Sequence, residues 1–297
     1  MKIAIILNGI SRKKKKFYKE IYPILTDHFN VDVLETQHAG HAEELAATAL
    51  NQEFDCILAA GGDGTLNHVI NGMMKNGSGN LPPIGLIPLG SGNDFARTCS
   101  LRPEARQLIQ LLKAGPKPTD IGKIECVYNG EKITRYFINE CSLGMGPEVV
   151  KRLSKSSSKW GPDLSYFISI VSTFISHRPQ EILCKTNSWT WKGKARVIAI
   201  ANGKSFGNGI FIAPDANPGD GILNSFIAGN VPLWKFLILL QTLKKKRKID
   251  DPDIHYNTLA RMELSSAEEC LLEAEGELVG LLPATITVLL DKINILR

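Results

Sequence analysis

The feature that most constrains this chain is the alternation of short apolar runs with helical patterns over residues 1–125. Each run is followed by a segment whose apolar positions recur at helical spacing. Repeated β-α units form a parallel sheet covered by helices on both faces, with right-handed crossovers. Ligands bind such sheets in crevices at the carboxyl ends of the strands. The strand runs are KIAIIL, VDVLET, FDCILAA and PIGLIPL, and the helical segments are 17–29, 42–50, 67–75 and 104–114.

Downstream of Asp120 the pattern changes to short β-rich runs separated by Gly, Pro and Asn turns. Two helical stretches, Leu164–Ser176 and Leu233–Lys246, interrupt these runs. The sequence therefore predicts an α/β plus β-rich fold: an N-terminal α/β domain over residues 1–125 and a C-terminal β-sandwich-like domain over residues 126–297. The β-rich runs are RYFINECSL, ARVIAIAN, GIFIAP, ILNSFIAG, ARMELSS, CLLEAEGEL and ATITVLL.

Length and composition fit two globular domains. The chain has 297 residues, which is long for a single core. Its 43% apolar and 22% charged residues exclude a disordered chain. The six cysteines lie far apart, which argues against a zinc or dithiol motif and is typical of buried thiols in a reducing cytosol. We therefore expect a cytoplasmic protein.

No segment has the pattern of a secretion signal or a membrane span. The opening MKIAIILNG has no basic leader or cleavage site and is interpreted as a first strand. Both apolar helical stretches fall short of the ~20 residues that a spanning helix needs. The sequence therefore favours a soluble protein.

Two basic runs, Lys13–Lys16 and Lys244–Lys248, carry much of the positive excess behind the formal charge of +5. One interpretation is a pair of solvated turns or helix ends. The alternative is peripheral contact with an anionic membrane surface, to which each nearby lysine contributes roughly 1 kcal/mol. Stacking aromatic residues do not interleave with these lysines, so we expect no nucleic acid partner.

Two glycine-rich loops each follow an apolar strand run and precede a helical segment. Glycine lets the backbone turn sharply and present N–H groups to phosphate oxygens, beside a helix N-terminus that favours anions. One such loop alone could be a tight turn, but two in one α/β domain indicate a phosphate site. The loops are Gly61-Gly62-Asp63-Gly64-Thr65 and Gly90-Ser91-Gly92-Asn93-Asp94.

The loops match neither the Gly-Lys-Ser/Thr phosphate loop nor the GxGxxG dinucleotide fingerprint. Each contains an acid instead, Asp63 or Asp94. A carboxylate beside a polyphosphate repels it unless a divalent cation lies between them, and Mg²⁺ favours one or two carboxylates together with substrate phosphates. The pattern therefore indicates Mg²⁺ and ATP.

These motifs also resemble a known family. GGDGTLN, together with PLGSGNDFAR, is similar to the soluble diacylglycerol kinase family, which includes sphingosine, ceramide and related bacterial lipid kinases. The likeness continues through TDIG at 119–122 and APDA at 213–216, and it ends at Glu275-Gly276-Glu277. GGDGT alone is shared with NAD kinases, whereas PLGSGNDFAR is more specific to lipid kinases.

The resemblance implies a role for each group of residues. Asp63, Asp94 and Asp120 would form a carboxylate network around the catalytic Mg²⁺. A second, structural Mg²⁺ would be held by Asp220 with backbone oxygens of Asn217 and Ile222; a simple exposed turn is the alternative. The nucleotide contacts implied are Thr36, Gly61, Gly62, Asp63, Gly64, Thr65, Leu66, Asn67 and Ser91.

The implied general base is Glu275, with Glu277 as second candidate. The family's Asp-Gly-Glu is Glu-Gly-Glu here, and the additional methylene displaces the carboxylate by about 1 Å, a shift that can cost about a hundredfold in rate. Strand alternation would place Glu273, Glu275 and Glu277 on one face.

The sequence thus predicts a kinase that transfers the γ-phosphate of ATP to a hydroxyl of a diacylglycerol-like or sphingoid lipid. In that case residues 1–125 would bind ATP and residues 126–297 would bind lipid. The alternatives are a kinase for NAD or another small molecule, and a non-catalytic nucleotide- or lipid-binding regulator. The expected partners are a membrane lipid and an anionic membrane surface, with a homodimer left open.

Two features outside these motifs complete the predictions. His38 and His41 lie three residues apart, but because the sequence shows no third ligand beside them, we expect no metal there. The segment 156–162 is expected to form a loop.

Overall fold

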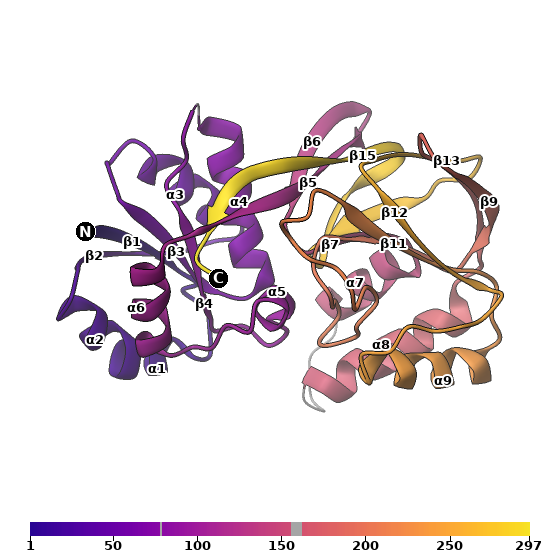
Figure 1. Ribbon diagram of the computed structural model, residues 1–297. Coiled ribbons are helices and arrows are strands. Elements are labelled where there is room, and N and C mark those ends of the chain that lie inside the picture. Colours follow the sequence, from indigo (N-terminus) through magenta and orange to yellow (C-terminus); the bar gives the residue numbers. More distant parts are fainter. Residues whose placement is uncertain (78, 156–161) are drawn as a thin grey trace. The chain divides into compact units, whose positions relative to one another are not determined.

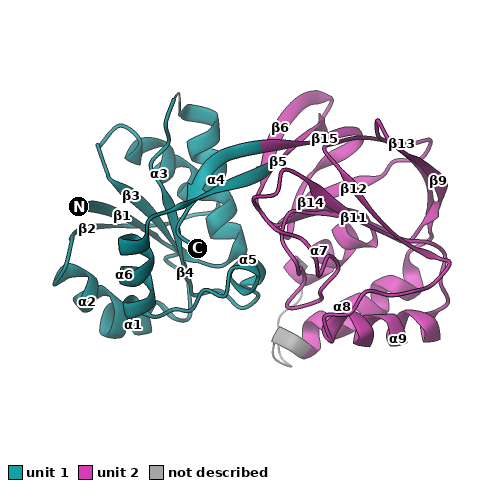
Figure 2. Cartoon of the chain, viewed as in Figure 1, with its two compact units in different colours: residues 1–121, 290–297 teal, residues 122–289 magenta. Residues whose placement is uncertain are grey.

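A computed structural model describes residues 1–77, 79–155 and 162–297, and it contains two compact units (Figure 2). Unit 1 comprises residues 1–121 and 290–297, and unit 2 comprises residues 122–289. The division thus lies after Ile121 rather than near residue 125, and the C-terminus returns to unit 1. The cause is the long strand β15 (Glu277–Ile295), whose Ile295 pairs with the unit 1 strand β4. Of the predicted loop at 156–162, only Pro162 lies within the described residues, and it begins a helix.

Unit 1 contains the predicted parallel sheet, in the order β15-β4-β3-β1-β2. Its central strand β3 is buried at every position, as expected of a parallel strand covered on both faces. Figure 1 shows α3 and α4 on one face, and α2 and α6 on the other. The strands are β1 (Lys2–Leu7), β2 (Asn30–Glu35), β3 (Cys56–Gly61) and β4 (Ile84–Pro88). The helices are α1 (Lys14–Lys16), α2 (Tyr22–Thr26), α3 (His41–Ala49), α4 (Asp63–Asn76), α5 (Asp94–Thr98) and α6 (Ala105–Ala114).

The helix expected over residues 17–29 is divided in the structure. A π-helical turn covers Phe17–Ile21, and α2 begins at Tyr22. Pro23 lies in the first turn of α2. Proline has no N–H to donate to the preceding turn, so the regular hydrogen-bond ladder is interrupted there.

Unit 2 is β-sandwich-like, as predicted. One antiparallel layer has the order β12-β11-β10-β7-β14, and a second layer contains β5, β6, β8, β9, β13 and β15. A buried core that includes Phe137, Leu143 and Met262 draws on strands of both layers. The first layer is β7 (Glu140–Gly144), β10 (Val197–Ala201), β11 (Leu223–Ala228), β12 (Ile254–Leu259) and β14 (Leu271–Ala274). The remaining strands are β5 (Lys117–Tyr128), β6 (Glu131–Phe137), β8 (Gln180–Lys185), β9 (Thr190–Ala195) and β13 (Arg261–Ser266).

Three helices cover the other face of the first layer: α7 (Met145–Lys155), α8 (Pro162–Ser176) and α9 (Leu233–Lys244). Their buried side chains, among them Phe174 and Leu240, share a core with Ala199 and Phe226 of the sheet. Within the described residues, no helix is both long and apolar enough to cross a membrane.

One predicted strand of unit 2 is wrong. GIFIAP at 209–214 forms a loop in which only Ile210 bridges, to Phe206. Gly207, Asn208 and Gly209 all have positive φ, which reverses the chain before a strand can extend.

Candidate active site

The two glycine loops lie against each other at the carboxyl end of the unit 1 sheet. The backbone N–H of Leu89 donates to Gly61 O at 2.8 Å, and that of Gly90 donates to the same oxygen at 3.1 Å. A Cβ added to Gly90 would lie 2.4 Å from the Cα of Gly62. Only glycine permits such an approach, so the loops following β3 and β4 form one backbone-lined surface.

Asp63 connects these loops. It is the first residue of α4, and its carboxylate accepts backbone N–H groups at the start of α5: Oδ2 from Asp94 and Oδ1 from Phe95, both at 3.0 Å. The carboxylate therefore satisfies N-terminal donors of a second helix. Because Asp63 holds α5 in place, it has a structural role that the sequence pattern did not indicate.

Asp94 lies beside Asp63 and is only 5% exposed. A Cβ added to Gly92 would lie 3.2 Å from Asp63 Oδ2 and 3.4 Å from Asp94 Oδ2, so both carboxylates border the space left by that glycine. Burial and the charge of Asp94 raise the pKa of Asp63, while its backbone hydrogen bonds oppose the rise. Two partly desolvated acids around a small space are a donor set that fits a divalent cation, because such an ion would offset their repulsion.

Two side chains that sequence analysis did not single out shape the second loop. Asn93 adopts a left-handed conformation (φ 53°), and its amide accepts from Gly90 N at 3.0 Å and donates to Gly90 O at 2.9 Å. Arg97 Nε donates to Gly92 O at 3.1 Å. The Gly-Asn pair within PLGSGNDFAR could have indicated a turn with a left-handed residue at Asn93, since Asn tolerates this conformation.

The ends of β1 and β2 also contribute to this edge. The hydroxyl of Thr36 accepts from Gly9 N at 3.0 Å, and Asn8 Nδ2 donates to the Thr65 hydroxyl at 3.3 Å. Lys13 Nζ donates to Gly90 O at 2.8 Å, so the first lysine of the N-terminal basic run lies at the glycine loops. The sequence did not identify Asn8 or Lys13 as site residues.

The other predicted nucleotide contacts differ in exposure. Ser91 is exposed and Gly64 is partly exposed, whereas Leu66 and Asn67 are buried in α4, at 1% and 3% exposure. The side-chain oxygen of Asn67 accepts from Asn71 Nδ2 at 3.0 Å. Leu66 and Asn67 therefore stabilise the helix that follows the loop, and contact with a nucleotide remains a prediction for them.

Asp120, the third predicted carboxylate, lies on β5 in unit 1 and is 1% exposed. Its Oδ1 accepts the backbone N–H of Asp291 at 2.9 Å. Asp120 thus anchors the returning end of β15. In the structure Asp63 and Asp94 lie together around Gly92, whereas the carboxylate of Asp120 bonds Asp291 in the C-terminal segment.

In unit 2, the expectation that Glu273, Glu275 and Glu277 share one strand face is wrong. β14 ends at Ala274, the chain reverses at Glu275-Gly276, and Ala274 pairs with Glu277 of β15. Both turn residues have positive φ, 54° and 81°, the geometry of a two-residue hairpin turn. The Glu275-Gly276 pair was the sequence signal for this turn. Because the chain turns there, the alternation of side chains along a single strand does not extend from Glu273 to Glu277.

The hairpin turn holds the Glu275 side chain in a fixed position. Its Oε1 accepts backbone N–H groups from Ile138 at 2.9 Å and from Asn139 at 2.6 Å, in the segment between β6 and β7. The residue is 9% exposed. Asn202 Nδ2 donates to Ile138 O at 2.8 Å and steadies that segment. Glu275 is therefore a carboxylate oriented by two donors.

Glu273 is more deeply buried, at 2% exposure, beside the buried Glu140. Its carboxyl group bonds the Ser142 hydroxyl, accepts Gly276 N at 3.0 Å and hydrogen-bonds Glu140. Burial raises the pKa of Glu273 to about 7, and its hydrogen bonds only partly oppose this effect. A hydrogen bond between two carboxyl groups requires a proton on one of them. Sequence analysis placed Glu273 on the acidic face but did not predict its burial.

The predicted second magnesium site is an exposed turn in this structure. Asp220 Oδ1 accepts Ile222 N at 3.2 Å, Asn217 O accepts Gly219 N at 2.7 Å, and Gly221 has a φ of 80°. Asn217, Asp220 and Ile222 are all exposed. This geometry accounts for the turn without an ion, and a metal at Asp220 remains a prediction.

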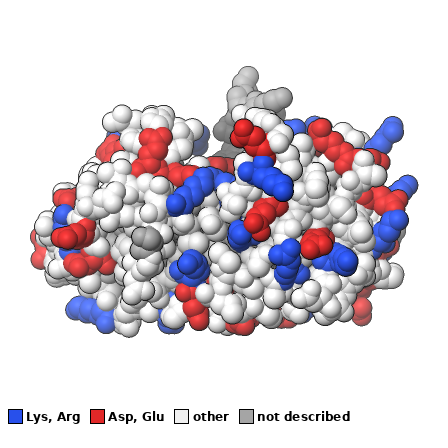
Figure 3. Space-filling view, turned by 90° about the horizontal axis from the view of Figure 1, so that it is seen from above, with Lys and Arg blue, Asp and Glu red and all other residues white. Residues whose placement is uncertain are grey.

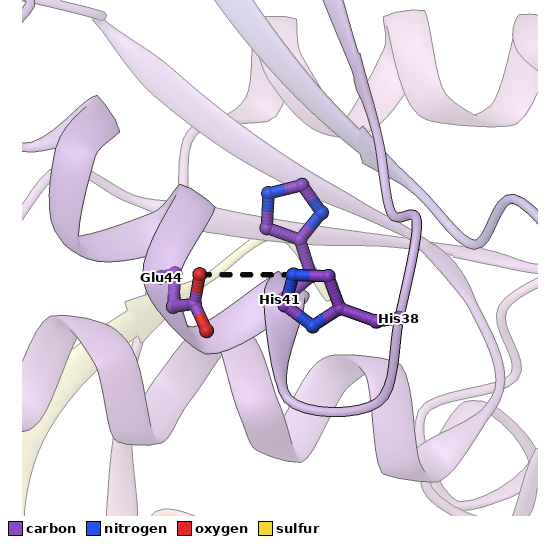
Figure 4. Close-up of side chains that lie close together, drawn as sticks. All are labelled: His38, His41 and Glu44. Atoms are coloured by element: carbon purple, nitrogen blue, oxygen red, sulfur yellow. Dashed lines mark ion pairs between the residues drawn. The ribbon is translucent and has the colours of Figure 1, made fainter.

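The structure adds a third group, Glu44, to the His38–His41 pair (Figure 4). The rings stack at 4.5 Å, and His38 Nε2 lies 4.0 Å from Glu44 Oε2. However, His41 Nδ1 accepts the backbone N–H of Gln37 at 3.0 Å. When His41 is neutral, this bond places its proton on Nε2. Neither ring nitrogen of His41 then offers a lone pair to a metal unless the side chain rearranges.

Comparison with known proteins agrees with this architecture. Residues 2–124 match the diacylglycerol kinase catalytic domain, and residues 141–297 match the YegS C-terminal NAD kinase beta sandwich-like domain. The two matches define a two-domain kinase with a sandwich-like C-terminal unit. The chain belongs to the diacylglycerol kinase and YegS-like lipid kinase family, which confirms the resemblance predicted from its motifs.

Individual relatives span nearly the whole chain. A diacylglycerol kinase of Bacillus subtilis (strain 168) is 28% identical over 99% of this chain and 96% of its own length. A protein of Alcanivorax borkumensis named "probable lipid kinase YegS-like" is 24% identical over 93% of this chain and 90% of its own length. A crystal structure of a diacylglycerol kinase from Bacillus anthracis matches the fold with a TM-score of 0.74 at 20% identity, covering 100% of this chain and 96% of that one. Yeast NADH kinase shares the fold more distantly, with a TM-score of 0.51 at 9% identity over 99% and 82%.

Proposed function

We propose that this lipid kinase transfers the γ-phosphate of ATP, with Mg²⁺, to a hydroxyl of a diacylglycerol-like or sphingoid lipid. The observation that carries the proposal is the pair of carboxylates, Asp63 and Asp94, that border Gly92 beside two glycine loops. This arrangement supplies donors for phosphate oxygens and ligands for the accompanying cation in one place.

Within unit 1, the glycine-loop backbone would bind the phosphates, and Asp63 and Asp94 would hold the metal. Thr36, Thr65 and Ser91 would supply hydroxyl groups at the same edge of the sheet. Bound Mg²⁺ would neutralise phosphate charge and align the transferring group. Because the loops are packed backbone to backbone, their donors are positioned before the nucleotide arrives.

Within unit 2, Glu275 would act as the general base. The backbone N–H groups of Ile138 and Asn139 orient its carboxylate through Oε1. As the acceptor hydroxyl attacks, its proton would pass to Glu275, which must lie about 2.6–3.2 Å away or act through one water. Glu277, the first residue of β15, is the alternative base.

A radiolabelled phosphate-transfer assay tests this proposal. ATP labelled in the γ position is incubated with diacylglycerol, a sphingoid base or NAD, each with Mg²⁺ and with a chelator. We expect Mg²⁺-dependent label in one of the lipids. Label in NAD alone would identify a small-molecule kinase. Intact ATP binding without transfer to any acceptor would indicate a regulator.

A further inference from the structure

The outward face of α8 is unusually apolar for a protein surface. Leu164, Ile168, Val171 and Ile175 recur at helical spacing. The side chains of Leu164, Ile168 and Ile175 are 46%, 49% and 69% exposed, and that of Val171 is partly exposed. Phe167 adds another exposed ring at 41%. Residues 164–176 contain no charged side chain. An amphipathic helix normally presents charged and polar residues to solvent. Here the polar side chains near the surface include Ser172 and Ser176, which accept from Arg152, and the rest of the outward face is apolar.

The neighbouring helix α9 extends this surface. Phe236 of α9 stacks on Phe174 of α8 with ring centroids 4.4 Å apart, and Figure 1 shows the two helices side by side. Trp234 and Ile238 are 66% and 57% exposed. We define the α8–α9 face by six exposed apolar side chains: Leu164, Phe167, Ile168, Ile175, Trp234 and Ile238. Exposed apolar clusters of this kind mark interaction or membrane surfaces.

Five consecutive cations begin at the end of α9, from Lys244 to Lys248, and all are exposed. Lys248 pairs with Asp215, but Lys244, Lys245 and Arg247 make no ion pair among the residues that the structure describes. Of the three acids that follow along the chain, Asp251 and Asp253 both pair with Lys235, and Asp250 is exposed. The apolar face therefore borders a concentrated positive charge. By contrast, the surface seen in Figure 3 intersperses charges of both signs.

The N-terminal basic run has a different environment. Lys13 donates to Gly90 O, Lys14 pairs with Glu35, and Lys16 lies 3.7 Å from Glu20. These three lysines are engaged within unit 1, and Lys15 is exposed. The run beside α9 combines exposed charge with six exposed apolar side chains on two helices, whereas the N-terminal run is accompanied by the exposed Ile10 and Tyr18.

We propose that the α8–α9 face, together with Lys244–Lys248, docks unit 2 on an anionic phospholipid bilayer. The inference rests on the proposed function, because a kinase whose acceptor is a membrane lipid must reach that membrane. The apolar side chains enter the boundary between headgroups and acyl chains, while the cations attract anionic headgroups. A second copy of this chain fits less well, because a two-fold interface through this face would bring two five-cation runs together.

Vesicle sedimentation separates the apolar and charged contributions. The probes are phosphatidylcholine vesicles and vesicles of phosphatidylcholine mixed with phosphatidylglycerol. We expect Trp234→Ser/Ile238→Ser to weaken binding to mixed vesicles at least tenfold. We expect Lys244→Gln/Lys245→Gln/Arg247→Gln to weaken it at least tenfold at low salt, with little effect on phosphatidylcholine alone and a reduced salt dependence.

Matched controls use exposed residues elsewhere. Ile24→Ser on α2 and Tyr128→Ser on β5 replace side chains that are 38% and 49% exposed. Lys185→Gln/Lys192→Gln/Lys194→Gln removes three exposed charges from the β8–β9 hairpin. These controls should bind as the wild type does. Binding of both face variants within twofold of the wild type would overturn the proposal. So would a wild-type dimer that the serine variant dissociates while its vesicle binding stays unchanged.

A second assay distinguishes failure of docking from failure of the proposed function. Short-chain diacylglycerol in detergent micelles reports transfer without a bilayer. We expect the serine variant to phosphorylate it at the wild-type rate while losing activity on vesicles. A wild type that binds vesicles through this face but phosphorylates no lipid would overturn the proposed function and leave the docking inference intact.

Discussion

The two units hold pairs of acidic side chains in contrasting ways. In unit 1, Asp63 and Asp94 lie at strand and helix ends, beside the space left by Gly92. In unit 2, Glu273 and Glu140 are buried within adjacent strands and hydrogen-bond each other. The unit 1 acids both border the position of the missing Gly92 side chain, whereas the unit 2 acids hydrogen-bond each other. Two acids placed together therefore do not by themselves indicate a metal site; what surrounds them decides.

The largest expected effect tests the unit 1 pair. Asp63→Asn removes the charge but keeps an oxygen that can accept a backbone N–H of α5. We expect kcat/KM for lipid phosphorylation to fall about a thousandfold, because the variant loses a metal ligand and the charge compensation it provides. Steady-state kinetics with varied Mg²⁺ would measure this fall.

The matched control for that change is Asp32→Asn, at an exposed position on β2 in the same unit. Asn is preferable to Ala, because Asp63→Ala would also leave the N–H groups of Asp94 and Phe95 without their acceptor. An Asp63→Asn enzyme with wild-type turnover would refute the metal assignment.

The next effect concerns the base. Glu275→Gln keeps the hairpin and an acceptor for Ile138 and Asn139 but cannot take up a proton. We expect kcat to fall about a hundredfold with little change in ATP affinity. Glu275→Asp keeps an ionisable carboxylate and tolerates the left-handed conformation of this turn, so it should stay active, at a rate above that of Glu275→Gln. Unchanged kcat in Glu275→Gln would show that Glu275 is not the general base and would favour Glu277 or a loop aspartate. The control is Glu263→Gln, a substitution at an exposed position on β13.

The third prediction tests whether the unit 2 pair holds a proton. The pKa of Glu273 rises from 4.5 to about 7 on folding, so the folded state retains a proton that the unfolded chain releases. This group therefore makes the free energy of unfolding fall between pH 4.5 and about 7. A 2.5-unit difference corresponds to roughly 3 kcal/mol.

Glu273→Gln mimics the protonated carboxyl and should remove that fall. The stability of the variant relative to wild type should thus increase as pH rises through this window, measured by denaturant unfolding at several pH values. Parallel stability–pH curves for wild type and variant would show that Glu273 does not retain its proton. Glu263→Gln again serves as the exposed control.

The smallest effect is expected at the exposed turn of unit 2. If Asp220 holds a structural magnesium, Mg²⁺ should stabilise the wild type in the absence of nucleotide by about 1 kcal/mol or less, because a single exposed carboxylate binds weakly. Asp220→Asn keeps the bond to Ile222 N and should lose that stabilisation. Equal Mg²⁺ responses in thermal unfolding would identify the site as a turn alone.

Much of the fold follows from local pattern. The four apolar runs of unit 1 became parallel strands because each is flanked by helical segments, and the glycine loops lie at their carboxyl ends. The patterns failed where a turn cut through an apparent strand. Glu275-Gly276 and the segment around Asn208 both reverse the chain through positive φ, which outweighs the β propensity of their neighbours.

By itself, the sequence determined the four parallel strands of unit 1, the two-unit class, the glycine loops with their acids and the family. These depend on residue type and spacing along the chain. Only the tertiary structure decided that Asp63 holds α5, that Asp120 anchors β15, that Glu273 is buried against Glu140 and that α8 and α9 share an apolar face. Such contacts join residues distant in sequence, where burial and partner geometry, rather than local propensity, set the charge state and role of each side chain.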